Sequence, residues 1–138
     1  MMKMTEHICL DTRILSFYLK GKKSALELLN RLKEENSKFY TTVINISEFY
    51  MGYYKTNTMT EEKNIKLNQF FELLNPKVLD FNSAELAGKL YGTELKSNPI
   101  GWRDTYIASI VLLNGKKIIT SNKKHFERVP NLEIIEYF

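Results

Sequence analysis

The fold of this chain depends on residues 8–12, ICLDT. A short apolar run, Ile8-Cys9-Leu10, ends in the carboxylate of Asp11 and leads through Thr12 into a second apolar segment. Such a run is typical of a strand buried on both faces of a parallel sheet, and open α/β sheets bind ligands at the carboxyl ends of their strands. Asp11 is therefore either a ligand-binding carboxylate or the N-cap of the helix that follows.

The rest of the chain alternates between strand-like and helix-like segments. Helical spacing of apolar residues, and turn residues at the ends, predict helices over 14–19, 22–35, 46–55, 58–74, 82–95 and 103–113. Apolar and β-branched runs predict strands over 8–12, 39–42, 78–80, 117–120 and 132–135. This alternation predicts an α/β fold, one domain over residues 1–138, with a central parallel sheet of about four to five strands covered by helices on both faces.

Two helix starts are predicted from local sequence. Thr58 with Glu61, and Asn82 with Glu85, each have the spacing of a capping box. The third helix, if it begins near residue 46, carries Glu48 in its first turn, where the helix dipole favours a carboxylate.

The composition is that of a globular protein of one domain. The chain has 138 residues, of which 43% are hydrophobic and 26% charged, and no apolar run is long enough to cross a membrane. The N-terminus lacks the apolar core of a signal peptide, so we expect a cytoplasmic protein without a membrane partner. The single cysteine, Cys9, is expected to be a core side chain. The net charge of +4 fits either ordinary solvation or contact with a polyanion.

Several chemistries are excluded by missing motifs. The chain has no Gly-rich Walker loop and no G-x-G-x-x-G after its first strand, which argues against a nucleotide-cofactor enzyme. Its two histidines, His7 and His125, lie beside no serine or cysteine nucleophile motif, which argues against a hydrolase with a histidine base.

Three carboxylates are expected at the same edge of the sheet. Asp11 ends the first strand, while Glu48 and Asp104 are placed near helix starts, where each could equally be a helix-stabilising residue. Three converging anions would repel one another unless a cation joined them, and carboxylate oxygens suit the hard ions Mg²⁺ and Mn²⁺. Asn122 follows the strand 117–120 and is either a fourth ligand or a turn residue. The cations that follow it belong either to a solvated loop or to a phosphate-binding surface: Lys123, Lys124 and Arg128.

At these residues the chain resembles a known family. The chain resembles the signature blocks of PIN domains, and more narrowly those of VapC-type toxins. The resemblance lies in the segments 8–12 (ICLDT), 42–52 (TVINISEFYMG), 100–126 (IGWRDTYIASIVLLNGKKIITSNKKHF) and 129–132 (VPNL). The resemblance covers almost the whole chain in order. Its most specific part is the block Asp104-x-x-Ile107-Ala108 followed by Thr120-x-Asn122.

The resemblance implies an Mg²⁺- or Mn²⁺-dependent endoribonuclease that acts as the toxin of a toxin–antitoxin pair. Asp11, Glu48 and Asp104 would be the metal-binding carboxylates, and Asn122 would occupy the fourth catalytic position. Many relatives carry Asp there, so Asn122 puts a strict two-metal mechanism in doubt. The implied partners are RNA, an antitoxin whose segment lies in the acidic groove, and a second copy of the chain in a homodimer.

Residues beside these positions are given supporting roles. Thr12 and Ser121 are expected to orient the carboxylates, while Arg13 and Arg103 would contact RNA or balance the acidic charge. Trp102 would either stack on an RNA base or be partly buried by packing near the turn, and packing is the expectation.

Three other functions stay open. The chain could be a non-catalytic RNA-binding or interaction module on a PIN scaffold, or a housekeeping PIN nuclease without an antitoxin. A phosphatase with Asp11 as its nucleophile is the third alternative, although the downstream lysine and acid that it requires are not identified.

Overall fold

The centre of the fold is a four-stranded sheet, seen in a computed structural model that describes residues 4–137. Its strands are β1 (Glu6–Leu10), β2 (Ser37–Tyr40), β3 (Lys117–Thr120) and β4 (Glu133–Glu136). They lie in the order β2-β1-β3-β4 and all neighbouring pairs are parallel. This confirms the predicted α/β class. Since β1 lies between β2 and β3, the residue that follows it, Asp11, stands near the middle of the sheet edge.

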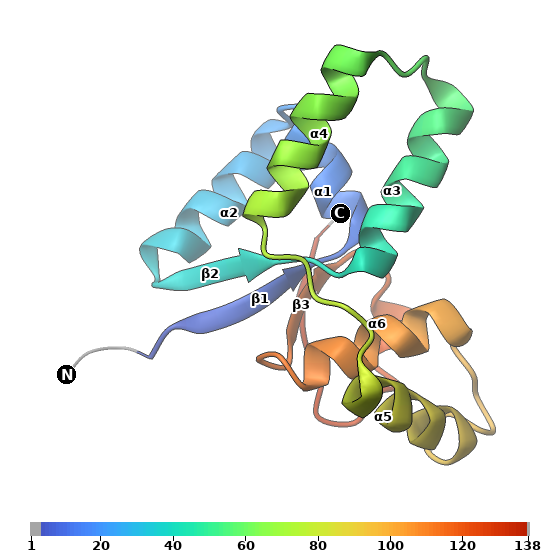
Figure 1. Cartoon of the computed structure of the whole chain (residues 1–138). Helices are drawn as coiled ribbons and strands as arrows, with labels where there is room; N and C mark the ends of the chain where they lie inside the picture. Colours follow the sequence, from blue (N-terminus) through green and yellow to red (C-terminus); the bar gives the residue numbers. More distant parts are fainter. Residues whose placement is uncertain (1–3, 138) are drawn as a thin grey trace.

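Helices cover both faces of this sheet (Figure 1). One face carries α1 (Thr12–Leu19), α2 (Lys23–Glu34), α3 (Val43–Thr56) and α4 (Glu61–Leu73), and the other carries α5 (Phe81–Gly92) and α6 (Trp102–Leu112). A short helix, α7 (Lys123–Phe126), connects β3 to the last strand. No helix within residues 4–137 is long and apolar enough to cross a membrane.

The two central strands, β1 and β3, have apolar residues buried on both faces, as their sequences predict. Ile8 and Leu10 pack against the helices of one face, whereas Cys9, between them, packs against the other. In β3, Ile119 and Ile118 divide in the same way. These side chains are at most 2% exposed, so the strands that carry the candidate site are held by the core.

One predicted strand is wrong. Residues 78–80 form no strand, and the chain instead makes a single parallel bridge between Thr42 and Lys77. Two backbone hydrogen bonds make this bridge: Lys77 donates to Thr41 and Val43 donates to Lys77, each over 2.9 Å. The segment joins the sheet edge just beyond β2 and leaves it after one residue, because Asp80 already caps the next helix.

Both predicted capping boxes are wrong in their residues. Thr60, not Thr58, caps α4 by accepting a hydrogen bond from the backbone N–H of Lys63. At α5 the reciprocal pair is Asp80 with Ser83, not Asn82 with Glu85, with two hydrogen bonds of 2.9 Å. In each case several capping residue types stand close together, and the backbone path selects among them.

The third helix begins three residues earlier than predicted. Thr42 is its N-cap and α3 starts at Val43, so Glu48 lies in the second turn. The helix dipole therefore does not explain a carboxylate at position 48, because its effect is confined to the first turn.

Candidate active site

Most of the predicted site residues line one cavity of about 450 Å³ at the carboxyl end of the sheet. It contains the four predicted catalytic residues, and Thr12, Arg13 and Arg103 lie beside them. Four segments that are distant in sequence build it: the end of β1 with the start of α1, α3, the start of α6, and the segment after β3 that leads into α7. The full lining is Asp11, Thr12, Arg13, Glu48, Ile100, Gly101, Trp102, Arg103, Asp104, Asn122 and His125.

Asp11 is held through both of its carboxylate oxygens. Its Oδ1 accepts hydrogen bonds from the backbone N–H of Thr12 (2.9 Å) and from Nδ2 of Asn45 (2.8 Å). Its Oδ2 accepts one from the Thr120 hydroxyl (2.5 Å). Burial raises the pKa of Asp11, and the Asp104 carboxylate raises it further, whereas these hydrogen bonds oppose the shift. Asp11 is thus the N-cap of α1 and a cavity carboxylate at once.

Glu48 reaches the cavity from α3. Thr12 donates a hydrogen bond from its hydroxyl to Oε1 over 3.2 Å, and the Arg103 guanidinium lies 3.8 Å from Oε2. Burial and the charge of Asp11 raise the pKa of Glu48, while Thr12 and Arg103 oppose the rise. The predicted orienting role of Thr12 therefore has a contact that fits it.

Asp104 lies in the first turn of α6, as predicted, but its partners are the N-cap of α7, Asn122, and a residue within α7, His125. Its Oδ2 lies 2.7 Å from Nδ1 of His125 and accepts a hydrogen bond from Nδ2 of Asn122 over 3.2 Å. Asn122 therefore presents a donor to the carboxylate and is placed to orient Asp104. The backbone N–H of Asn122 is in turn held by the hydroxyl of Thr120 over 2.9 Å.

The structure corrects the role expected for Ser121. The hydroxyl that contacts Asp11 belongs to Thr120, the residue before it. Thr120 is 1% exposed at the end of β3, where the strand points its side chain at the neighbouring carboxylate. Ser121 does not line the cavity.

Three predicted RNA-binding cations lie outside the cavity lining. Lys123 pairs with Glu136 over 3.7 Å, and Arg128 donates from Nη1 to the carbonyl of Pro99 over 3.1 Å. Lys124 is exposed on α7. Only Arg13 and Arg103, of the five, line the cavity.

Trp102 packs against the ring of Tyr106, but it is more exposed than the expected packing implies. It is 61% exposed at the first position of α6 and lines the cavity.

The site also contains functional candidates that were not predicted from the sequence. Asn45 and His125 are the clearest: a fully buried polar residue one turn before Glu48, and a histidine three residues after Asn122. These helical spacings are the signals that could have identified them.

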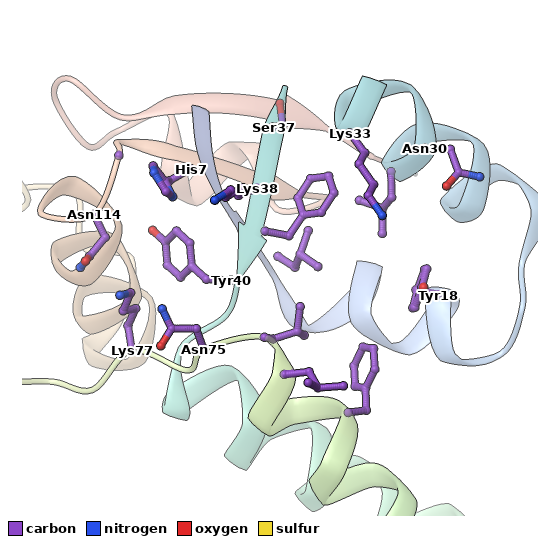
Figure 2. Close-up of a pocket in the computed structure, with 17 residues that line it drawn as sticks. His7, Tyr18, Asn30, Lys33, Ser37, Lys38, Tyr40, Asn75, Lys77 and Asn114 are labelled. Carbon is purple, nitrogen blue, oxygen red and sulfur yellow. The ribbon is translucent and has the colours of Figure 1, made fainter. Parts of the chain in front are cut away.

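A larger groove of about 860 Å³ lies elsewhere, along β2 (Figure 2). Among the described residues its charged lining consists of basic side chains, including Lys33, Lys38 and Lys77, with no carboxylate. This groove therefore lacks the donors that a hard cation needs, and the smaller acidic cavity is the candidate active site.

The donor set of the acidic cavity suits a divalent cation, with one restriction. Within residues 4–137 no three His, Cys, Asp or Glu side chains stand close enough together to coordinate one ion directly. Mg²⁺ commonly uses one or two protein carboxylates and keeps several waters. Burial first, and then repulsion from a neighbouring carboxylate, raise the pKa of Asp11 and of Glu48, and a bound cation would oppose both effects.

Comparisons with known proteins agree with this geometry. A family model described as PIN domain matches residues 8–132. Ribonuclease VapC2 of Haemophilus influenzae is 29% identical over 123 residues, which are 87% of this chain and 89% of that protein.

Solved structures match almost the whole chain. VapBC2 from Rickettsia felis, bound to a DNA fragment from its promoter, aligns with a TM-score of 0.77 and 26% identity over 96% of this chain and 99% of the other. VapBC-1 from nontypeable Haemophilus influenzae aligns with a TM-score of 0.72 and 25% identity over 94% and 97% of the two chains.

Proposed function

The chain belongs to the PIN domain family, and from this premise we propose that it is an endoribonuclease that uses Mg²⁺ or Mn²⁺ to hydrolyse RNA phosphodiester bonds. One observation carries the proposal: Asp11, Glu48 and Asp104, which are up to 93 residues apart in sequence, line a single cavity together with Asn122. Structural requirements alone explain Asp11 and Asp104 as first-turn or capping residues, but not Glu48 in the second turn of α3.

Asp11 and Asp104 are the carboxylates best placed to hold the cation. Asp104 is near enough to raise the pKa of Asp11 by charge repulsion, and within residues 4–137 neither carboxylate forms a salt bridge with a lysine or an arginine. Glu48 already has the Arg103 guanidinium beside it, which suits a ligand that acts through a metal-bound water. When bound, such an ion supplies an activated water and neutralises charge on the phosphate.

The remaining residues would position these groups. Asn45 and Thr120 fix the two oxygens of Asp11, and Asn122 and His125 fix one oxygen of Asp104. Such outer contacts typically change metal affinity or activity about 10- to 100-fold when removed. Arg13 and Arg103, at the cavity wall, would contact the RNA phosphates that flank the cleaved bond.

We propose further that the nuclease is a toxin silenced by an antitoxin whose segment enters the acidic cavity. The resemblance to VapC-type toxins and the similarity to VapBC assemblies support this role.

A homodimer and a cytoplasmic location belong to the same proposal. Phe49 and Phe71 are buried core residues, so the apolar surface left for a dimer on α3 and α4 includes Met51, Tyr54 and Ile65, each more than half exposed.

Cleavage of a structured RNA by the purified, partner-free chain tests the nuclease. We expect cleavage that requires added Mg²⁺ or Mn²⁺ and is lost in Asp11→Asn and Asp104→Asn. Glu85→Gln, a carboxylate-to-amide change on the exposed face of α5, is the matched control and should cleave normally. Cleavage that survives both cavity substitutions, or none in the wild type, would overturn the proposal.

Metal binding can be tested without activity. Because a ligand that binds the folded state raises the melting temperature, Mn²⁺ should stabilise the wild type and Glu85→Gln but not Asp104→Asn. If RNA binds while Mn²⁺ has no such effect and no product forms, the non-catalytic RNA-binding module becomes the better description.

A further inference from the structure

We propose that Trp102 forms a stacking site for an unpaired RNA base at the rim of the acidic cavity. This site rests on the proposed ribonuclease function and adds to it the part of the substrate that lies beside the cleaved bond. Base stacking on an aromatic face tolerates many sequences, but it requires a base that is free of a duplex.

The first observation is the exposure of Trp102. Tryptophan has the largest apolar side chain, yet this one is 61% exposed. It stands at the first position of α6, two residues before Asp104, and lines the same cavity. An indole ring that is mostly in water beside a polar cavity leaves aromatic surface on which a planar nucleobase can stack.

The second observation is that the backbone under Trp102 is fixed. Ile100, two residues earlier, is 5% exposed and anchors the turn in the core. Gly101 adopts φ +88°, which favours glycine, and its carbonyl accepts hydrogen bonds from the hydroxyl (2.7 Å) and the backbone N–H (3.1 Å) of Thr105. Arg128 holds the turn from outside through the carbonyl of Pro99. Trp102 is therefore a positioned side chain and not part of a loose loop.

The third observation is the arrangement of neighbouring side chains. The rings of Trp102 and Tyr106 meet in a T-shaped contact, with centroids 5.6 Å apart and planes at 64°. This contact fixes the orientation of the indole ring without burying it. Arg103 follows directly and keeps a side chain that is 53% exposed. A base on Trp102 would thus have a cation nearby for its phosphate, as in single-strand binding sites.

Trp102 is the only tryptophan in the chain, so its fluorescence reports on this site directly. The experiment titrates the wild-type chain, in EDTA to prevent cleavage, with an eight-nucleotide oligouridine. We expect quenching that saturates. A blunt RNA duplex of the same length and an inorganic polyphosphate should not quench, because neither offers an unpaired base.

Substitutions at Trp102 measure what stacking contributes. Removing a stacked aromatic side chain typically weakens binding at least fivefold per base, so Trp102→Ala should bind oligouridine at least fivefold more weakly, while Trp102→Phe should retain most of the affinity. Both variants should keep the wild-type circular dichroism spectrum, since the side chain is largely outside the core. In the double variant Phe81→Trp with Trp102→Phe, the indole moves to a position that is 82% exposed and outside the cavity lining, where RNA should not quench it.

The outcomes separate this site from the nuclease proposal. Quenching and a loss of affinity in Trp102→Ala, without metal-dependent cleavage, would support the base site and contradict the nuclease. Cleavage without quenching, and with equal affinity in Trp102→Ala, would leave the nuclease standing and overturn the base site. Equal quenching by duplex and single strand would also overturn it, because the site would then recognise no free base.

Discussion

Asn45→Ala is the substitution that best tests the internal support of the cavity. Asn45 is fully buried at the start of α3 and contacts three side chains from two segments of the chain. Its Nδ2 donates to Oδ1 of Asp11 over 2.8 Å and to the hydroxyl of Thr12 over 3.1 Å, and its Oδ1 accepts from the hydroxyl of Thr42 over 2.7 Å. Alanine removes all three hydrogen bonds and leaves a buried carboxylate short of one donor.

The expected loss follows from these contacts. A hydrogen bond to a charged group contributes about 1.5–3 kcal/mol, and each neutral one about 0.5–1.5 kcal/mol. Because the surroundings relax and the contributions are not fully additive, we expect the free energy of unfolding to fall by about 3 kcal/mol. For a domain of this size that corresponds to a melting temperature lower by about 10 °C.

Urea unfolding, followed by circular dichroism and by Trp102 fluorescence, measures this loss. Asn45→Asp keeps the volume but replaces the amide donor with a carboxylate beside Asp11, so it should be at least as destabilising at neutral pH. Asn30→Ala, the same change on an exposed position of α2, should shift stability by less than about 0.5 kcal/mol. A loss below about 1 kcal/mol in Asn45→Ala would refute the reasoning, because the three contacts would then contribute almost nothing.

The remaining predictions concern backbone and helix-cap positions. Gly115→Ala should destabilise the chain by about 1–3 kcal/mol in urea unfolding, because Gly115 has φ +109° and an added Cβ would lie 2.6 Å from the His7 carbonyl oxygen. Gly88→Ala, inside α5 with open space around it, should instead raise the free energy of unfolding by about 0.5–1 kcal/mol. If both substitutions changed the free energy of unfolding in the same direction, this explanation would fail. Hydrogen bonds from the backbone N–H and side chain of Ser83 lower the pKa of Asp80 below its ordinary value of 3.8, so its contribution to stability is complete above that value and is lost as the pH falls through the lowered one. Asp80→Asn keeps the cap but does not titrate, so melting temperatures measured between about pH 6 and pH 2.5 should fall more steeply for the wild type than for this variant.

The sequence was sufficient to predict the α/β class and to bring Asp11, Glu48, Asp104 and Asn122 to one edge of the sheet, where they line one cavity. Short apolar runs such as Ile8-Cys9-Leu10 are buried on both faces, and a parallel sheet brings their carboxyl ends to one edge whatever the details of the loops. That rule places Asp11 and Asn122 together without any knowledge of packing. The same rule could not predict that the chain makes a single bridge near the strand expected at 78–80. The length of that pairing depends on how the chain leaves the sheet edge after β2.

The supporting residues were harder to predict because their roles depend on side-chain direction. Thr120 and Ser121 are equally good hydroxyl donors in sequence, but only Thr120 points from the end of β3 toward Asp11. The start of α3 was placed three residues late, which concealed that Thr42 caps the helix and that Asn45 belongs to its first turn. The i, i+3 spacing of Asn45 and Glu48 places the two side chains on one helix face only when Asn45 is known to lie inside α3.

The two interpretations of Asp11, helix cap and ligand, are compatible because they use different parts of the carboxylate. Oδ1 accepts the cap hydrogen bond from the backbone N–H of Thr12, whereas Oδ2 has one contact, with the Thr120 hydroxyl. A carboxylate oxygen offers about two acceptor sites, so Oδ2 keeps one for a cation. The cap thus fixes the direction of the group, and the buried strand β1 fixes its position. One residue can therefore both cap α1 and present a carboxylate to the cavity.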